Sequence, residues 1–248
     1  MQFPLLRPPI VEAVLDIDCD LPSDRPLDAL EEQARAAFSD RYPVFRKSLI
    51  QEHMIETKTD AAPRHALRHG LQAYQLLSQD EKQLVQVRVS GFSFNRLAPY
   101  TTLDDYLPEI ERTWRLFVTL ASPVQVRRIG LRTINRIPLP LVEGQVRIEN
   151  FFTVPPRLPN VDGLALTGFL HQHTALEVAT GFQVNMVLAA QPLEKEALPV
   201  IFDNGVWAVS SSEPGDWDKI AETILALRGL RNRLFQHTLK ESCLKLFQ

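Results

Sequence analysis

Cysteine is scarce in this sequence, because the 248 residues include only Cys19 and Cys243. Two cysteines are too few for a disulfide framework and too few for a structural zinc site built from thiolates. Cys19 lies in a strand-like run and Cys243 lies near the C-terminus. We therefore expect both thiols to be reduced and to serve as packing residues.

Long apolar runs are also missing. No stretch approaches the roughly 18 apolar residues that suggest a membrane-spanning helix. Residues 1–15 lack a basic start, a long apolar stretch and a small-residue cleavage site, which are the marks of a secretory signal peptide. The sequence therefore predicts a protein that is neither embedded in a membrane nor exported, and we expect it in the cytoplasm.

The motifs of several common enzyme classes are absent as well. The sequence has no glycine-rich phosphate-binding loop ahead of a helix, no Gly-x-Ser-x-Gly elbow, no His-Glu-x-x-His pair and no Cys-x-x-Cys pair. Each of these motifs positions a reactive or ligand-binding group, so their absence disfavours the enzymes that depend on them. Enzymes whose active sites are assembled from scattered residues are not excluded.

What the sequence does contain is typical of a folded globular protein. Hydrophobic residues make up 45% of the chain and charged residues 23%, and thirteen phenylalanines are spread along it. This composition supports a sizeable core and argues against disorder. The net charge of −3 gives no general attraction to phosphate backbones, so a nucleic-acid role would need a local basic patch.

Apolar residues recur with the periods of strands and helices along the chain. In residues 85–94 the alternation slips by one residue, which we interpret as one strand with a bulge at Gly91. Pro108 predicts a kink or a restart in the middle helix, and Thr238 with Glu241 matches a capping box that would begin a short last helix. The predicted strands are 8–19, 45–57, 66–77, 85–94, 124–139, 164–178, 182–190 and 200–210, and the predicted helices are 26–42, 103–117 and one beginning after Asp216.

The order of these elements predicts the fold class. Strands and helices do not alternate regularly, as they do in doubly wound folds, and neighbouring strands can pair through short hairpins. We therefore predict an α+β fold, with a large antiparallel sheet and helices packed mainly on one face. The first half, through Leu139, resembles a ferredoxin-like split βαβ unit enlarged by one strand. We expect one domain over residues 1–248, with a long loop or a subdivision near 141–163.

A row of arginines is the first candidate site. Arg128, Arg132 and Arg136 share parity in the predicted strand 124–139, so they would lie along one face, and Arg88 and Arg96 would add to the row from a neighbouring strand. Guanidinium groups match phosphate and carboxylate oxygens, so the row could bind an anionic ligand, a protein partner or nucleic acid. Acidic side chains on adjacent strands could equally neutralise it.

A histidine pattern is the second candidate site. His171, His173 and Glu177 share parity and would project from the same face of one strand. Two imidazoles and a carboxylate suit a divalent transition metal. The spacing is similar to the first cupin motif, His-x-His-x3-Glu, but the flanking glycines are misplaced and no fitting later histidine strand is present. The alternative is a polar, solvent-facing row in an antiparallel hairpin.

Four segments together resemble a known protein family. They are residues 8–19, residues 91–114 with the run Gly-Phe-Ser-Phe-Asn-Arg-Leu-Ala-Pro-Tyr, residues 128–136 with the run Arg-Ile-Gly-Leu-Arg-Thr-Ile-Asn-Arg, and residues 227–247. They are similar to a sporadically distributed bacterial family of about 250 residues that is defined by homology and lacks an established activity. The resemblance covers nearly the full length. It implies one unit and an accessory bacterial gene, and it assigns no catalytic residue.

Two functional hypotheses follow from these observations. The favoured one is a non-catalytic binding protein, without a cofactor, whose arginine-bearing sheet face meets an anionic ligand, a partner protein or nucleic acid. Self-association into a homo-oligomer would also cover the edge strands of a large sheet. The alternative is an enzyme that uses His171, His173 and Glu177 to hold a divalent transition metal as its cofactor.

Overall fold

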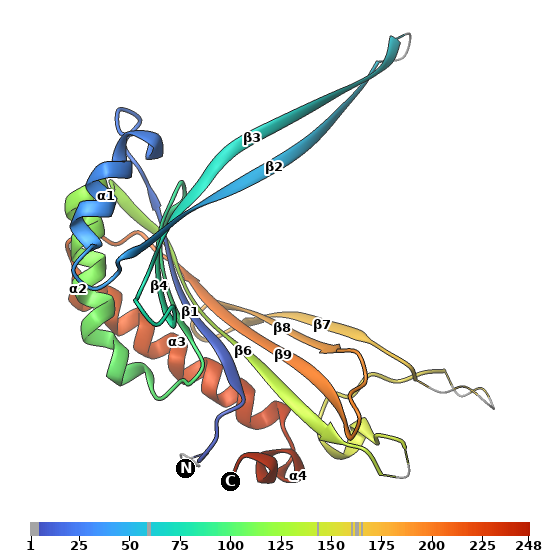
Figure 1. Ribbon diagram of the computed structural model, residues 1–248. Coiled ribbons are helices and arrows are strands. Elements are labelled where there is room, and N and C mark those ends of the chain that lie inside the picture. The colour runs from blue at the N-terminus through green and yellow to red at the C-terminus, as the bar shows by residue number, and fades with distance from the viewer. Residues whose placement is uncertain (1–4, 59–60, 143, 160, 162–163, 165) are drawn as a thin grey trace.

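Alternation of apolar residues produces the strands, and in the described residues nine of them join into one sheet. The computed structural model describes residues 5–58, 61–142, 144–159, 161, 164 and 166–248, and within residues 51–69 it describes the backbone alone. The strand order is β2-β3-β4-β5-β1-β6-β9-β8-β7, and every neighbouring pair is antiparallel. Figure 1 shows α1, α2 and α3 on the same side of the curved sheet. The predicted α+β class, with helices mainly on one face, is confirmed.

The first half of the chain forms one side of the sheet and part of the helical layer. Its elements are β1 (Ile10–Asp20), α1 (Glu31–Phe38), β2 (Val44–Lys58), β3 (Ala61–Leu77), β4 (Gln83–Arg88), β5 (Gly91–Leu97) and α2 (Leu103–Ala121). The chain crosses from β1 to the edge strand β2 and returns strand by strand until β5 pairs with β1. Because all neighbours are antiparallel, β1 and β2 run in the same direction, separated by β3, β4 and β5. The unit is therefore a split βαβ unit enlarged by two strands, one more than predicted.

The structure has one more strand than predicted because a turn next to Gly91 divides residues 85–94 between β4 and β5. Our interpretation of residues 85–94 as one bulged strand was wrong, because the chain reverses there and Arg88 pairs with Gly91 across a tight turn. Gly91 has a φ of +131°, and a Cβ at this position would lie 2.3 Å from the carbonyl oxygen of Ile17. Only glycine fits such a backbone. The slip in the apolar pattern thus marks a hairpin turn between β4 and β5.

The second half completes the sheet. Its elements are β6 (Gln125–Pro140), β7 (Leu170–Glu177), β8 (Phe182–Ala190), β9 (Ala197–Val209) and α3 (Trp217–Thr238). β6 pairs with β1 and β9, whereas β7 pairs with β8 as predicted, but β7 begins later than predicted, at Leu170. Between β6 and β7, Ile148 and Phe152 are buried in a second apolar cluster with residues of β6, β8, β9 and the C-terminal segment.

The start of α2 follows the local signals of the sequence. The Thr102 hydroxyl accepts a hydrogen bond from the Asp105 backbone N–H at 3.3 Å, and the Asp105 carboxylate accepts one from the Thr102 N–H at 3.2 Å. This reciprocal pair is a capping box. The helix then runs unbroken through Pro108, where we predicted a kink or a restart.

The end of α3 differs from the prediction. Asp216 caps the start of this helix by accepting a hydrogen bond from the Lys219 N–H at 3.2 Å. The predicted capping box at Thr238 is wrong, because α3 continues to that residue, and the short helix α4 (Glu241–Leu244) begins only after Lys240. The residue that was predicted to begin a new helix is therefore the last residue of α3.

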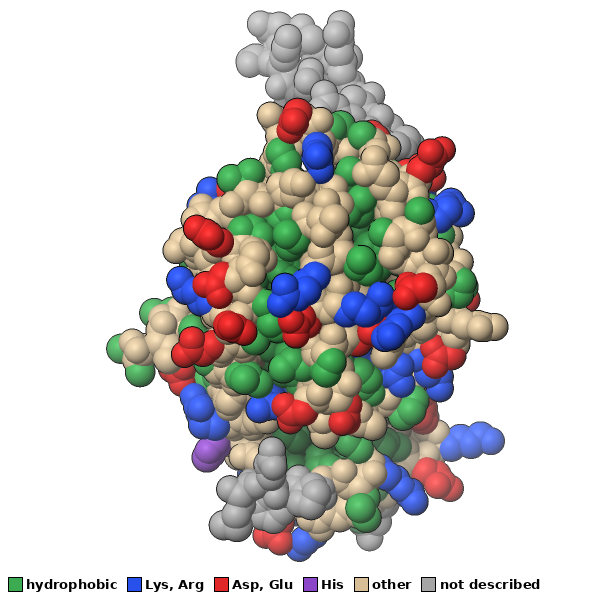
Figure 2. Space-filling view, turned by 90° about the vertical axis from the view of Figure 1, so that its left-hand side faces the viewer, with side chains coloured by type: hydrophobic (Ala, Val, Ile, Leu, Met, Phe, Trp, Pro, Cys, Tyr) green, Lys and Arg blue, Asp and Glu red, His purple; other side chains and the backbone are tan. Residues whose placement is uncertain are grey.

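The main core lies between the helices and the covered face of the sheet. Trp114 of α2 is buried, and its ring centroid lies 5.6 Å from that of Phe92 in β5 and 5.3 Å from that of Phe117. Its indole N–H donates to the carbonyl of Pro214 at 3.0 Å, which joins α2 to the segment ahead of α3. Figure 2 shows the outer side of the helical layer, where acidic and basic side chains are interspersed. Among the described residues, no helix combines the length and the apolar character of a membrane span.

Both cysteines are free and buried, as predicted. Cys19 belongs to the main core and Cys243 to the second cluster. Burial raises the pKa of each thiol to about 12. Both are therefore neutral at pH 7 and act as packing groups.

Replacing Gly91 with alanine tests the turn between β4 and β5. We expect Gly91→Ala to lower the free energy of unfolding by about 2–3 kcal/mol, because the new Cβ meets the backbone of β1 in a strained conformation. Gly181→Ala is the matched control, since Gly181 also has a positive φ, +74°, but has nothing within 4 Å of the added Cβ. That control should lose only about 1 kcal/mol. Urea denaturation measures both, and equal losses would contradict the close approach at Gly91.

Candidate functional site

The face of the sheet opposite the helices is exposed and carries charges of both signs. Along β1, Leu15 and Ile17 are buried in the core, whereas Asp16 and Asp18 alternate with them and are partly exposed. Successive side chains of a strand point to opposite faces, so the carboxylates lie away from the helices. We call this surface the open face. The register places there Arg88 of β4, Ser93 and Asn95 of β5, Glu12, Asp16, Asp18 and Asp20 of β1, Arg128, Arg132 and Arg136 of β6, and Asp203 and Trp207 of β9.

Asp18 joins two of the predicted arginines. Its Oδ1 accepts from Arg88 Nη2 at 2.8 Å, and its Oδ2 accepts from Arg128 Nε at 2.8 Å. Arg88 Nη2 also lies 3.3 Å from Asp16 Oδ1. The side chains of Arg88 and Asp18 are only 20% and 24% exposed, so these ion pairs are partly shielded from water.

The other two arginines of the row are also paired. Arg132 donates from Nε to Asp203 Oδ1 at 2.7 Å and makes a second bond to the same carboxylate through Nη2. The hydrogen bonds to Asp203 raise the pKa of Arg132, and the nearby charges of Glu12 and Asp16 add to that shift. Arg136 pairs with Glu194. The arginine row therefore exists on one face, and acidic side chains of neighbouring segments neutralise it.

Arg96 is not part of this row. It shares parity with Phe92 and Phe94, which face the helices, because the hairpin at Gly91 places Arg88 and Arg96 on opposite faces of the sheet. Its guanidinium lies 5.3 Å from the ring centroid of Tyr106 in α2, and Nη2 donates to the Pro99 carbonyl at 3.4 Å. The expectation that Arg96 joins the others on one sheet face was wrong.

A hollow of about 350 Å³ opens in the open face beside these ion pairs. The Trp207 ring forms one wall, and the Arg128 guanidinium lies 5.8 Å from its centroid. Charged and polar side chains supply the other walls, namely Asp16, Arg132, Asn185 and Asp203. The hollow thus combines a flat aromatic surface with equal numbers of arginine and aspartate side chains.

Two glycines leave this hollow open. Gly130 of β6 pairs with Trp207, and Gly205 of β9 pairs with Arg132, so they are close across neighbouring strands. A Cβ would meet its nearest atom at 3.6 Å at Gly130 and 3.7 Å at Gly205, which are ordinary contacts, and neither residue has a positive φ. Neither packing nor backbone conformation therefore requires glycine here. A glycine inside a strand without such a need is typical of a site where another molecule approaches the backbone closely.

The histidine pattern lies elsewhere, on the edge strand β7. The register keeps His171, His173 and Glu177 on one face, the side of the helices, and the two Nε2 atoms lie 2.7 Å apart. Glu177 is engaged by other groups, since it accepts from Arg233 of α3 at 2.5 Å and from the Thr180 hydroxyl at 2.6 Å. Within the described residues, no three His, Cys, Asp or Glu side chains are grouped so that they could hold a metal ion.

Sequence reasoning missed the hollow although it found two of its arginines. Trp207, Asp203 and Asn185 lie in segments that were predicted as strands, but nothing local indicates that they meet Arg128 and Arg132. The available signal was the pair of glycines inside otherwise apolar strands, Gly130 and Gly205.

The comparisons with protein families and with curated proteins give no match. The resemblance to a bacterial family therefore stays a prediction.

Removing the charge of Asp18 tests the ion pairs at the centre of the open face. We expect Asp18→Asn to lower the free energy of unfolding by about 1–2 kcal/mol, because it weakens the bonds to Arg88 and Arg128 in a partly shielded setting. Asp20→Asn is the matched control on the same strand, since Asp20 pairs with the more exposed Arg127. It should cost at most about 1 kcal/mol. Chemical denaturation of both variants measures the difference, and a larger loss for Asp20→Asn would contradict the central role of Asp18.

Proposed function

We propose that this chain is a non-catalytic binding protein that takes a protein partner on its open face. The hollow over Gly130 and Gly205 would hold a side chain and an adjoining stretch of the partner's backbone. The observation that carries the proposal is the pair of strand glycines that neither packing nor φ requires. Because they lack side chains, both glycines line a hollow beside an aromatic wall, although they are themselves buried.

The balance of charge favours a protein partner over nucleic acid. The walls of the hollow carry Arg128 and Arg132 together with Asp16 and Asp203. A phosphate backbone would gain the arginines but would also meet both carboxylates, and it would have to compete with existing ion pairs. A protein segment offers groups of both signs and apolar surface. Tryptophan and arginine are also enriched where proteins meet other proteins.

A second copy of the chain is another partner that the structure supports. The edge strand β7 carries exposed apolar side chains, with Leu170 74% and Leu176 58% exposed. An uncovered edge strand offers unpaired backbone groups to another strand. Self-association would therefore use the edge of the sheet, whereas the hollow lies nearer its centre and stays accessible to a different protein.

The alternative proposal remains an enzyme that binds a divalent metal through His171 and His173. The close approach of the two imidazoles favours it, whereas the ion pair of Glu177 with Arg233 weighs against a third ligand from this set. Elemental analysis of protein purified without affinity metal distinguishes the two proposals. Near-stoichiometric metal that is lost in His171→Ala would favour the enzyme.

Filling the hollow tests the binding proposal. We expect Gly205→Val to keep the fold, because a Cβ there makes only ordinary contacts and valine suits a strand, but to reduce partner capture at least about tenfold. Gly168→Val is the matched control, since Gly168 has nothing within 4 Å of an added Cβ and lies outside the hollow. Quantitative mass spectrometry of proteins captured by the parent and both variants provides the comparison.

Two outcomes would contradict this proposal. The first is a Gly205→Val variant that folds normally and captures the same proteins in the same amounts as the parent. The second is co-purified nucleic acid, seen as excess absorbance at 260 nm that nuclease removes and that Gly205→Val no longer retains. The second result would assign the hollow to nucleic acid instead.

A further inference from the structure

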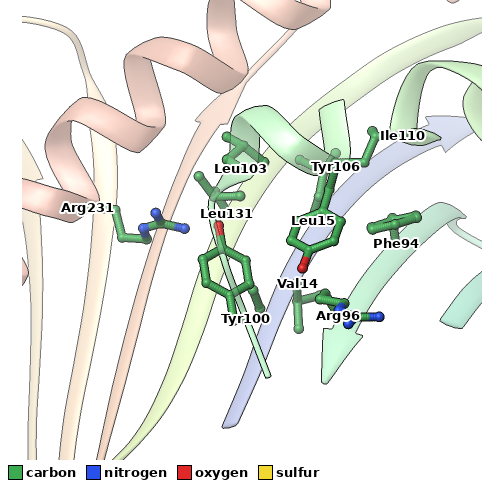
Figure 3. Close-up of a pocket in the computed structure, with 11 residues that line it drawn as sticks. Val14, Leu15, Phe94, Arg96, Tyr100, Leu103, Tyr106, Ile110, Leu131 and Arg231 are labelled. Carbon is green, nitrogen blue, oxygen red and sulfur yellow. The ribbon is translucent and has the colours of Figure 1, made fainter. Parts of the chain in front are cut away.

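A small cavity lies on the other side of the sheet, beneath the helices. It holds about 20 Å³ and lies between the start of α2, the inner side of α3 and the covered face of β1, β5 and β6. Figure 3 shows the side chains that surround it. Most are apolar, such as Phe94, Leu103 and Leu131, and the polar groups come from Arg96, Tyr100, Tyr106 and Arg231. Among the residues that the structure describes, no carboxylate lines it.

Arg231 of α3 is a buried cation that has no acidic partner in the described part of the chain. The residue is 6% exposed, its Nη1 atom makes no hydrogen bond, and its Nη2 atom donates to Asn232 Oδ1 at 3.0 Å. Within the part of the chain that the structure describes, the groups that act on its charge are Tyr100 and Arg228, and Arg228 already pairs with Asp104. Burial lowers the pKa of Arg231, which the hydroxyl of Tyr100 opposes. An uncompensated buried charge is strongly unfavourable.

A second guanidinium adds positive potential to the same cavity. Arg96 lies over the Tyr106 ring, and its Nε atom is buried without a hydrogen bond. The Tyr100 hydroxyl points toward Arg231 in Figure 3. The cavity therefore offers the unbonded Nη1 amino group of Arg231, a hydroxyl and two positive charges inside mostly apolar walls, which is the chemistry that binds an anion.

We propose that this cavity is a binding site for one small inorganic anion of the size of chloride, held by Arg231 and Tyr100. The volume admits a single occupant about as large as a water molecule. A water molecule would satisfy the free N–H but would leave the charge of Arg231 uncompensated. Phosphate, sulfate and organic carboxylates are larger than a volume of about 20 Å³ admits.

Thermal unfolding at constant ionic strength tests this site. Sodium chloride is exchanged stepwise for sodium gluconate, whose anion is too large for the cavity. At chloride concentrations above the dissociation constant of the site, we expect the unfolding midpoint to rise by about 3–5 °C for each tenfold increase in chloride concentration. The parent protein should broaden the chloride-35 NMR signal. Added bromide should reverse this broadening because it displaces the bound chloride.

Two variants assign the effect to the cavity. Arg231→Met keeps the volume of the side chain but removes the charge, so its unfolding midpoint should not depend on chloride. Arg228→Met changes the neighbouring arginine, which lies outside the cavity, and should keep the dependence of the parent. If Arg231→Met fails to fold, Tyr100→Phe removes only the hydroxyl and should weaken the dependence on chloride.

The proposal is overturned by either of two results. One is a parent protein whose unfolding midpoint is the same in chloride and gluconate. The other is a chloride dependence that persists unchanged in Arg231→Met or, where that variant does not fold, in Tyr100→Phe. Either result would assign the cavity to water.

Discussion

The two faces of β1 set the constraint on which the rest of the structure depends. β1 lies between β5 and β6 in the sheet. Leu15 and Ile17 on one face are buried under the helices, so α2 and α3 must cover that face. Asp16 and Asp18 on the other face are partly shielded and cannot stay unpaired without a cost in free energy. The arginines of β4 and β6 supply their partners. The helical layer and the ion pairs of the open face are thus two results of one alternating pattern.

In this arrangement acidic side chains neutralise the arginines of the open face. Each arginine of the row is bonded to a carboxylate from a neighbouring segment, so a ligand must offer more than negative charge. The hollow over Gly130 and Gly205 offers a concave surface and the Trp207 ring beside those pairs. Beneath the helices the balance is reversed, because no carboxylate of the described residues pairs with Arg231 and the surrounding walls are mostly apolar. The two faces therefore present different chemistry: a surface of mixed charge, and a small positive cavity with mostly apolar walls.

Sequence periodicity was sufficient for features that depend on neighbouring residues alone. Alternation placed Arg128 and Arg132 on one face, and the spacing of His171, His173 and Glu177 placed them on one face of a strand. Features that depend on pairing between distant segments could not be obtained in this way. Asp203 reaches Arg132 only because β9, and not β7, pairs with β6. Arg96 lies on the face opposite to the predicted one because the chain turns at Gly91. Arg231 did leave a local signal, since it follows Ile220, Ile224 and Leu227 on the apolar stripe of α3.

The helices cover one face of the sheet and leave the face with Trp207 accessible. Acrylamide quenching of tryptophan fluorescence tests it directly, because Trp114 and Trp217 are buried and Trp207 is partly exposed. Comparison of the parent with Trp207→Phe should show quenching that is several-fold weaker in the variant. Equal quenching of the two proteins would show that Trp207 is covered, either by the chain itself or by a second copy, and would contradict an open face.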